Sequence, residues 1–363
     1  MVDIKSLPFP ELKTILTSAG EKTYRAEQIY EWLHKHLVTD FAEMTNIPKA
    51  TQISLSRQFT LPAFPIQAVR ESASDGTRKY LFALADGHLI ESVWMQYKHG
   101  NSVCISSQVG CRMGCAFCAS AIGGLARSLT AGEMLEQVYA VTRHTGARVS
   151  HVVVMGIGEP LDNYEALLAF IKILSDEKGL HISQRNITVS TCGLVPEIYR
   201  LADEMLQINL ALSLHAATDE KRRRLMPIAK VHPLPELMKA CQYYFMKTGR
   251  RLTFEYSLIH DINDSATDAM ELKKLIFSYK KKNNHLSDIP CHINLIPLNP
   301  VTEREFHTSS SKNAKDFKNI LEKYQINVTI RREMGSDIDA ACGQLRNKLL
   351  KSRSCDARIS CDD

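Results

Sequence analysis

Three cysteines near the middle of the chain have the spacing of a metal-cluster loop. Cys111, Cys115 and Cys118 form a Cys-x3-Cys-x2-Cys motif. Three thiolates this close in sequence can hold one face of an iron–sulfur cluster, which normally takes four cysteine ligands. A cluster held by only three cysteines keeps one iron open for a small molecule. The motif therefore predicts a redox centre with an open coordination position.

Structural zinc is the alternative use of these thiols, with Cys104 as the fourth ligand. Zinc sites usually take their ligands from two separated pairs, whereas Cys104 stands seven residues before Cys111 in a predicted strand. The chain holds ten cysteines, which is many for a cytoplasmic protein, where thiols are kept reduced. Their spacing favours the cluster over zinc.

Strands and helices alternate along the chain after residue 101. Strands are predicted at 103–107, 151–155, 186–190, 208–214, 252–258 and 291–296, with a further strand at 326–331. Amphipathic helices are predicted at 131–145, 164–175, 234–247, 265–280 and 312–324. Such alternation is typical of a parallel sheet with right-handed crossovers. Six units are too few for a closed eight-stranded barrel, so we expect an α/β fold with a partial (β/α)6 barrel.

The first hundred residues follow a different pattern. Short helices are predicted over 11–18 and 24–36. Asp75-Gly76 and Asp86-Gly87 are typical hairpin turns between strands of period two. The predicted units are a helical domain at 1–60, a small β-hairpin unit at 61–96, the β/α core at 97–335 and a C-terminal segment at 336–363.

Composition and charge limit the classes of protein that the chain can belong to. Its 363 residues are 44% hydrophobic and 23% charged, which excludes disorder as the main state. No run approaches the ~18 apolar residues of a membrane span, and residues 1–10 lack a signal pattern. We therefore expect a cytoplasmic protein with no membrane partner. Residues 221–282 hold 14 Lys and Arg against 6 Asp and Glu, but basic runs such as 221–224 are more typical of solvated helix faces than of RNA sites.

The sequence around the cysteines resembles the RlmN family of radical S-adenosylmethionine (SAM) enzymes, RNA adenine methyltransferases related to the resistance enzyme Cfr. The resemblance extends from about residue 23 to residue 348, in the order of the family. Its motifs are CISSQVGCRMGCAFCA, VVMGIGEPLDN, SLHAATDE, INLIPLNP and DIDAACGQL. It implies a radical SAM barrel with a C-terminal extension that carries Cys342. It also implies two cofactors, SAM and a [4Fe–4S] cluster on Cys111, Cys115 and Cys118.

The resemblance further implies contacts to SAM at the ends of strands. The implied residues are Gly158, Glu159, Ser190, Ser213, Leu214, His215 and Asn299. Taken singly, each has a structural explanation, such as a turn glycine or a satisfied hydroxyl. The predicted strands nevertheless place all of them at one rim, where the chemistry of β/α barrels gathers. Their shared position beside the cysteine motif favours contacts to a ligand.

The implied chemistry is a relay, because a ring carbon of adenine is not nucleophilic toward SAM. Cys342 accepts a methyl group from one SAM, since thiolates are good nucleophiles. A radical from a second SAM removes hydrogen from that methyl, and the carbon adds to adenine. The family pattern assigns removal of the ring proton to Glu91 and release through a transient disulfide bond to Cys104. From the residues alone, Glu91 is equally consistent with a solvent-facing strand position, and Cys104 with a small buried residue.

Two further functions stay open beside methylation of carbon 2. Cfr-like methylation of carbon 8 would use the same residues, although Pro160 in MGIGEP favours carbon 2, because alanine is expected there in Cfr. A non-catalytic RNA-binding protein with structural zinc is the alternative from another class. No role is predicted for Cys192, Cys241, Cys291, Cys355 and Cys361.

The implied partners are large-subunit ribosomal RNA, transfer RNA and an electron donor such as flavodoxin or ferredoxin. We expect a monomer. The N-terminal helical domain, with Tyr24 and Arg25, is a candidate for docking RNA, which proteins read through shape, phosphates and stacking. A domain that only stabilises the barrel explains the same residues equally well.

Overall fold

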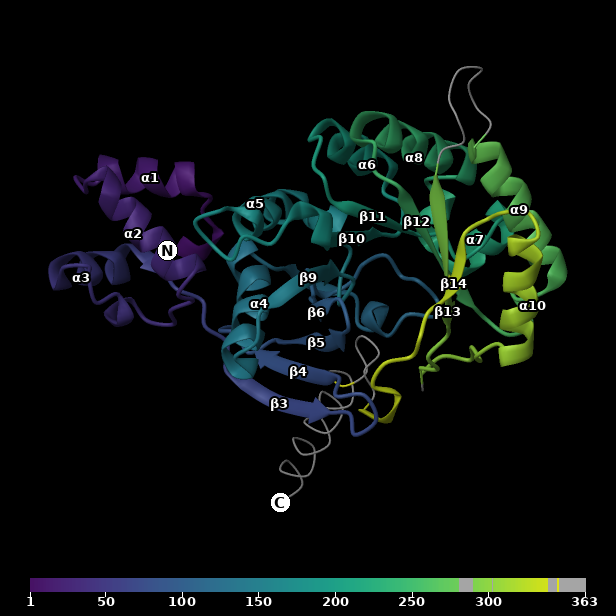
Figure 1. The fold of residues 1–363 in the computed structure, drawn as a ribbon, viewed down its shortest axis with the longest axis horizontal. Coiled ribbons are helices and arrows are strands. Elements are labelled where there is room, and N and C mark those ends of the chain that lie inside the picture. Colours follow the sequence, from purple (N-terminus) through teal and green to yellow (C-terminus); the bar gives the residue numbers. More distant parts are fainter. Residues whose placement is uncertain (281–289, 302, 339–344, 346–363) are drawn as a thin grey trace, which may run out of the picture.

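A computed structural model describes residues 1–280, 290–301, 303–338 and 345. Its main sheet consists of β3 (Ile66–Glu71), β4 (Arg78–Ala83), β5 (Leu89–Tyr97), β6 (Gly100–Cys104), β9 (Val149–Val154), β10 (Ile187–Thr191), β11 (Asn209–Ser213), β12 (Leu252–Leu258), β13 (Cys291–Pro297) and β14 (Val328–Ile330). The order across this ten-stranded sheet is β14-β13-β12-β11-β10-β9-β6-β5-β4-β3 (Figure 1).

The strands from β6 onward form the predicted partial barrel. β6 and the strands from β9 to β14 pair in parallel, each with its neighbour in the sheet. The helices between them are α4 (Ala131–Thr145), α5 (Tyr164–Ser175), α6 (Val195–Asp203), α7 (Asp219–Leu225), α8 (Leu234–Thr248), α9 (Ala266–Lys280) and α10 (Ser311–Glu322). The parallel β/α core expected from the sequence is confirmed. The short helices α6 and α7, of nine and seven residues, were not predicted.

The hairpin strands extend the barrel sheet and do not form a sheet of their own. β3, β4 and β5 pair antiparallel, and β5 pairs antiparallel with β6. The predicted turns are present, because Gly76 and Gly87 have φ angles of 71° and 83° that favour glycine. This continuity places Glu91 of β5 on the strand next to Cys104 of β6.

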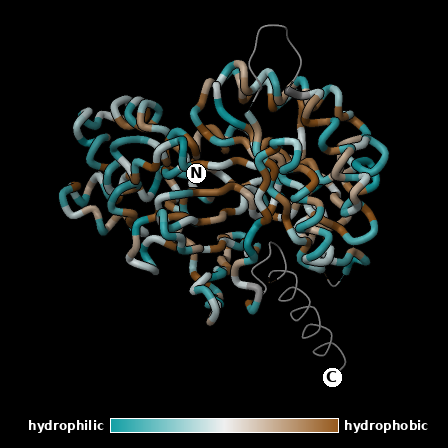
Figure 2. The backbone as a smooth tube through the Cα atoms, turned by 45° about the vertical axis from the view of Figure 1, so that its right-hand side comes forward, coloured by the Kyte–Doolittle hydropathy of each residue, from teal (hydrophilic) through white to brown (hydrophobic). Residues whose placement is uncertain are grey.

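The core strands have one apolar and one polar face. Residues such as Val189, Leu212 and Phe254 belong to the main hydrophobic core together with residues of the helices, and Figure 2 shows much of the brown, hydrophobic backbone in the interior. Alternation along each strand turns its polar side chains to the opposite face. These include Thr188, Ser190, Ser213, Thr253, Glu255, Ser257 and Asn294. Within the described part of the chain, no helix combines the length and hydropathy needed to cross a bilayer.

The N-terminal helices α1 (Phe9–Ser18), α2 (Thr23–His34) and α3 (Lys49–Gln58) lie together at one end of the molecule (Figure 1). Buried polar contacts fix them to α4. The Lys5 ammonium forms an ion pair with Glu136 at 2.6 Å and donates to the Pro62 carbonyl at 2.7 Å, and both charged side chains are fully buried. His34 Nδ1 lies 2.8 Å from the Tyr139 hydroxyl. Burial lowers the pKa of His34 to about 3, so the ring is neutral.

The residues considered for RNA docking lie on the outside of this unit. Tyr24 is 50% exposed, and the Arg25 guanidinium lies 5.2 Å from the centre of its ring. An exposed aromatic ring beside a cation suits stacking on a base. The docking role stays a prediction.

Replacing Lys5 by methionine should destabilise the protein, because the buried Glu136 carboxylate would keep only Arg143 as a charged partner among the described residues. Breaking a buried pair in this way costs roughly 3 kcal/mol of the free energy of unfolding. Lys35→Met is the matched control, since Lys35 pairs with Glu31 on the surface at 4.0 Å and such a pair contributes about 0.5 kcal/mol. Urea unfolding measures both variants, and equal stabilities would contradict the role of Lys5.

Candidate active site

The cysteine motif lies in a loop after β6 that a small hairpin frames. β7 (Gln108–Gly110) pairs antiparallel with β8 (Leu125–Ser128) on either side of the loop. The Cys111 N–H donates to the Gly124 carbonyl at 3.0 Å, and the Cys118 N–H to the Cys115 carbonyl at 3.2 Å. Gly110 has a φ of 83°, and a Cβ there would collide with the Gly124 carbonyl oxygen. Backbone contacts thus fix the loop that carries the three thiols.

The thiols occupy an environment in which they cannot ionise alone. Cys111 is buried, and Cys115 and Cys118 are half-buried. Burial raises the pKa of Cys111 to about 12. It also raises the pKa of Cys115, and the charges that Cys118 and Cys111 would carry act in the same direction. Burial thus favours the protonated thiols. Positive charge bound by the loop would favour the thiolates instead, because metal ions deprotonate coordinating thiols.

The spacing of the sulfurs fits a cluster better than a single ion. Within the described residues, only the group His260, Asp261 and Asp264 places three ligand atoms within 4.8 Å of one another. At least one pair of the three motif sulfurs is therefore more than 4.8 Å apart, which is farther than a single zinc ion with Zn–S bonds of ~2.3 Å would hold them. This spacing is compatible with a group that contains several metal atoms.

The loop after β9 presents backbone beside the cysteine loop. Gly158 has a φ of 114°, and a Cβ there would lie 2.7 Å from Gln108 Cβ and from Ser107 Oγ. The buried Glu159 carboxylate accepts from the Cys192 N–H at 2.7 Å and from the Leu161 N–H at 3.1 Å. Burial raises the pKa of Glu159. Because these bonds engage the carboxylate, the backbone near Gly158 is the part better suited to a ligand's amino group.

His215 joins the end of β11 to the cysteine loop. Its Nδ1 accepts from the Ser257 N–H at 3.0 Å, and its ring packs edge-on against Phe117 at 4.9 Å between centroids. Burial, with a smaller effect of the Arg222 charge, lowers the pKa of His215 to about 3. The ring is therefore neutral. A φ of 55° adds backbone strain of the kind that clusters at functional sites.

The structure brings most of the predicted site residues to the same edge of the sheet. Ser190 lies near the end of β10 and donates to the Val154 carbonyl at 3.0 Å. Ser213 is the last residue of β11. Asn299 is exposed, two residues after β13. Cys342 lies outside the described residues, as do Cys355 and Cys361.

Glu91 and Cys104 lie on one face of neighbouring strands. Val93 pairs with Cys104 in the sheet, and alternation puts Glu91 on the same side as Val93. Glu91 is only 3% exposed and forms an ion pair with Lys79 at 3.0 Å. The alternative interpretation of Glu91 as a solvent-facing residue is therefore wrong. Cys104 is 7% exposed and packs with Val93 and Met95.

The remaining cysteines show no resident cross-link. No disulfide joins any two of the seven cysteines that the structure describes. The disulfide expected between Cys104 and Cys342 therefore has no support from the structure. Cys192 is buried beside the half-buried Cys115 in a small apolar cluster. Cys241 belongs to the main core, and Cys291 begins β13.

Sequence reasoning missed two buried charges at this edge of the sheet. The basic run at 221–224 was expected to face solvent, and Arg223 and Arg224 are exposed, but Arg222 is fully buried. Its spacing of three from the buried Leu225 could have revealed the shared helix face. Glu255 is buried on the polar face of β12 and accepts from Asn294 Nδ2 at 2.8 Å. Burial raises the pKa of Glu255.

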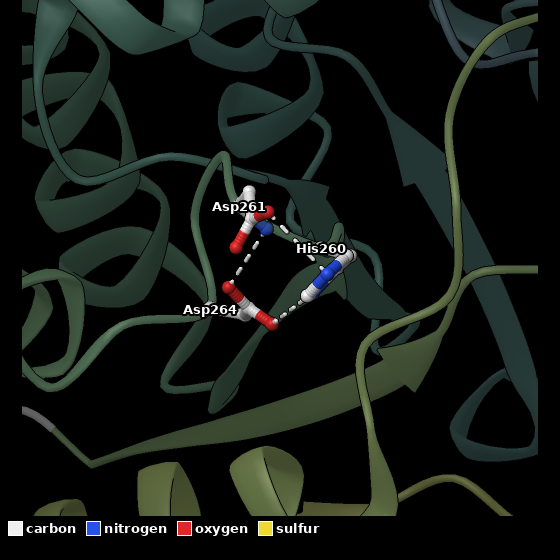
Figure 3. A group of neighbouring side chains, drawn as sticks. All are labelled: His260, Asp261 and Asp264. Carbon is white, nitrogen blue, oxygen red and sulfur yellow. Dashed lines mark hydrogen bonds and ion pairs between the residues drawn. The ribbon is translucent and has the colours of Figure 1, made fainter.

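A second polar group, in the loop after β12, only resembles a metal site (Figure 3). His260, Asp261 and Asp264 converge there. The Asp264 carboxylate already accepts from Ser309 Oγ at 2.6 Å and from Asn313 Nδ2 at 3.2 Å. Burial opposes its ionisation, but these hydrogen bonds outweigh it and lower the pKa of Asp264. We interpret the group as a structural contact that holds this loop to the start of α10.

The barrel and its cysteine loop define a radical SAM enzyme. The Radical SAM superfamily matches residues 105–272, and its members in general use SAM and a [4Fe–4S] cluster. The N-terminal domain of ribosomal RNA large subunit methyltransferases matches residues 2–61. This second match coincides with the helical unit that precedes the sheet.

Relatives along the whole chain narrow this class to one family. The chain is 55% identical over 345 residues to the "Probable dual-specificity RNA methyltransferase RlmN" of Lachnoclostridium phytofermentans, covering 95% of this chain and 94% of the relative. It is 53% identical over 351 residues to the protein of the same name in Lachnospira eligens, covering 97% of each. A crystal structure of a radical SAM methyltransferase from Sphaerobacter thermophilus superimposes with a TM-score of 0.88 at 42% identity, covering 95% of this chain and 99% of that one. The chain belongs to the RlmN family and is a SAM-dependent RNA methyltransferase.

Gly158→Ala should weaken SAM binding by at least about tenfold, or ~1.4 kcal/mol. The new Cβ would push the β9 loop away from Ser107 and Gln108. Gly20→Ala is the control, since Gly20 has a φ of 91° and no atom within 4 Å of a Cβ. Equilibrium dialysis of the anaerobic holoenzyme measures the affinity. Unchanged affinity in Gly158→Ala would contradict the placement of SAM at this loop.

Proposed function

We propose that the enzyme methylates carbon 2 of adenine in large-subunit ribosomal RNA and in transfer RNA, through a methylated Cys342. The observation that carries the proposal is the placement of Glu91 and Cys104 on one face of adjacent strands. Cys104 ends β6, the strand that leads into the cysteine loop. Pro160, which begins a 3-10 helix directly after Glu159, supports carbon 2 over the carbon 8 of Cfr-like enzymes. We expect a cytoplasmic monomer.

The strand ends would hold both cofactors. Cys111, Cys115 and Cys118 would bind the cluster. SAM would contact Gly158, Glu159, Ser190, Ser213, Leu214, His215 and Asn299. When bound, the two cofactors supply one-electron chemistry that can remove a hydrogen atom from a methyl group. The chain orients the reactants and excludes water, to which the packing of Phe117 on His215 contributes.

The protein residues would act in sequence on one carbon atom. The Cys342 thiolate would attack the methyl carbon of SAM, and a carbon–sulfur bond would form as the methyl–sulfonium bond breaks and S-adenosylhomocysteine leaves. After this methyl loses a hydrogen atom, its carbon bonds to carbon 2 of adenine. The ring proton would pass to Glu91, and the remaining electron would pass to the cluster held by Cys111, Cys115 and Cys118, which was oxidised when it gave an electron to SAM. These two losses restore the aromatic ring.

Release would need the second thiol. The Cys104 thiolate attacks the sulfur of Cys342, and a disulfide forms as the carbon–sulfur bond breaks. The electron pair leaves with the carbon, which takes a proton and becomes the methyl group of the product. An electron donor such as flavodoxin or ferredoxin, and a thiol reductant, would prepare the enzyme for the next cycle.

Reaction with SAM that carries a fully deuterated methyl group tests the proposal. Mass spectrometry of the nucleosides should find 2-methyladenosine with two deuterium atoms, because the relay removes one of three. The substrates are large-subunit ribosomal RNA and transfer RNA that lack the modification. The 8-methyl isomer would show Cfr-like chemistry instead. A product that keeps all three deuterium atoms would exclude the relay.

Cys104→Ala should trap the enzyme on its RNA, since nothing would then attack the adduct on Cys342. A denaturing gel would show a shifted band that nuclease removes. Cys241→Ala is the control, because Cys241 is a buried thiol of the main core. Normal turnover in Cys104→Ala without a trapped species would contradict the assignment and leave Cys104 a small buried residue.

Glu91→Gln should abolish methylated RNA while SAM cleavage continues, because the ring proton would have no acceptor. The substitution also removes the anion that pairs with the fully buried Lys79. The double variant Lys79→Met/Glu91→Gln removes both charges and separates the two effects. It should regain stability in urea unfolding but stay inactive in the nucleoside assay. Recovered methylation would show that the pair is only structural.

A further inference from the structure

The short helix α7 connects the cysteine loop to the ends of the core strands. The Ala116 N–H, between the second and third cysteines, donates to the Leu225 carbonyl at 2.8 Å. Leu225 and Met226 pack with Cys192 and with the half-buried Cys115 in one apolar cluster. The end of α7 is therefore part of the wall around the cysteine loop.

Arg222 carries a positive charge from α7 into this wall. The side chain is fully buried. Its Nη2 donates to the Cys192 carbonyl at 2.6 Å and, at 3.4 Å, to the Ser213 carbonyl, and its Nε donates to the Leu214 carbonyl at 3.2 Å. These three acceptors lie at the ends of β10 and β11. They are neutral carbonyls, so they orient the guanidinium but do not neutralise it.

Two features of Arg222 call for an anionic partner. Its Nη1 makes no hydrogen bond to any residue that the structure describes, although a buried guanidinium normally uses its donors. No carboxylate in that part of the chain forms an ion pair with it. A buried cation without a counter-charge is costly. Burial lowers the pKa of Arg222, and Cys192, Cys115 and, more weakly, the Asp219 carboxylate act in the opposite direction.

We propose that Arg222 is the fixed counter-charge of the iron–sulfur cluster and raises its reduction potential. A cluster bound by three thiolates carries net negative charge, and its reduction adds one further negative charge. A cation in low dielectric stabilises the reduced form more than the oxidised form, and net charge and hydrogen bonds to sulfur set such potentials. The unpartnered Nη1 can donate to a cluster sulfur. The inference rests on the cluster assigned to Cys111, Cys115 and Cys118.

One buried group opposes Arg222. The Glu159 carboxylate lies close enough to raise the pKa of Cys111 and of Cys115 further, after burial and the neighbouring thiols. Its hydrogen bonds from the Cys192 and Leu161 N–H groups partly neutralise it. Asp219 of the same helix attracts Arg222, but it forms no ion pair with the guanidinium, and its carboxylate accepts from the Leu234 N–H at 2.8 Å. The field at Cys115 is therefore sensitive to the arginine.

Redox titration of the reconstituted holoenzyme, followed by electron paramagnetic resonance, tests the inference. Arg222→Met removes the charge at similar length and should shift the midpoint potential of the cluster to a lower value. Arg223→Met is the matched control, because Arg223 is the next residue of the same helix and is exposed; it should keep the wild-type potential. Arg222→Lys retains a cation and should recover most of the shift.

An unchanged potential in Arg222→Met with full iron content would overturn the inference. If circular dichroism shows that Arg222→Met is folded but the variant retains no cluster, the iron content of Arg222→Lys decides between a counter-charge and a structural role. A cluster retained in Arg222→Lys with the wild-type potential would support the counter-charge. Loss of the cluster equal to that in Arg222→Met would overturn it and leave Arg222 a structural residue. A wild-type protein that binds no [4Fe–4S] cluster would instead overturn the function proposed above.

Discussion

Neighbouring thiols that are buried together do not ionise unless positive charge is bound among them. This constraint governs the region around Cys111, Cys115 and Cys118, where burial raises the pKa of Cys111 to about 12. The surrounding chain holds the thiols in place through backbone contacts, from the β7–β8 hairpin on one side and from Leu225 on the other. Iron would supply most of the missing charge. The protein supplies a fixed remainder at Arg222.

Other polar side chains lie near the three thiols but do not compete with them as ligands of the cluster. The Glu159 carboxylate is engaged by backbone N–H groups, and His215 is neutral. The strands of the hairpin continue the barrel sheet, so the Glu91–Lys79 pair lies on the same face as Cys104. A separate hairpin domain would not fix this geometry. The N-terminal unit is held to α4 by the buried Lys5–Glu136 pair.

Long elements with strong periodicity could be predicted from the sequence to the residue. Strand β12 and helices α4 and α5 have the predicted bounds, because each buries a regular apolar face. The strand of Glu91 was predicted, but its burial was not, since alternation does not show which face another layer covers. Arg222 was missed because its burial depends on contacts with Cys192 and Leu214, and a charged seven-residue helix has little apolar period. The strand ends were predicted to carry the site; the structure places these ends along one edge of the sheet, and their role in binding stays a prediction.

The central claim is that three cysteines at this edge hold a [4Fe–4S] cluster with one iron open to SAM. Mössbauer spectra of the enzyme reconstituted with iron-57, recorded with and without SAM, test it most directly, because a change in coordination alters the signal of the affected iron. The account predicts a cluster in which a single iron changes its parameters when SAM is added. Spectra that do not respond to SAM, or that show no [4Fe–4S] cluster, would contradict it.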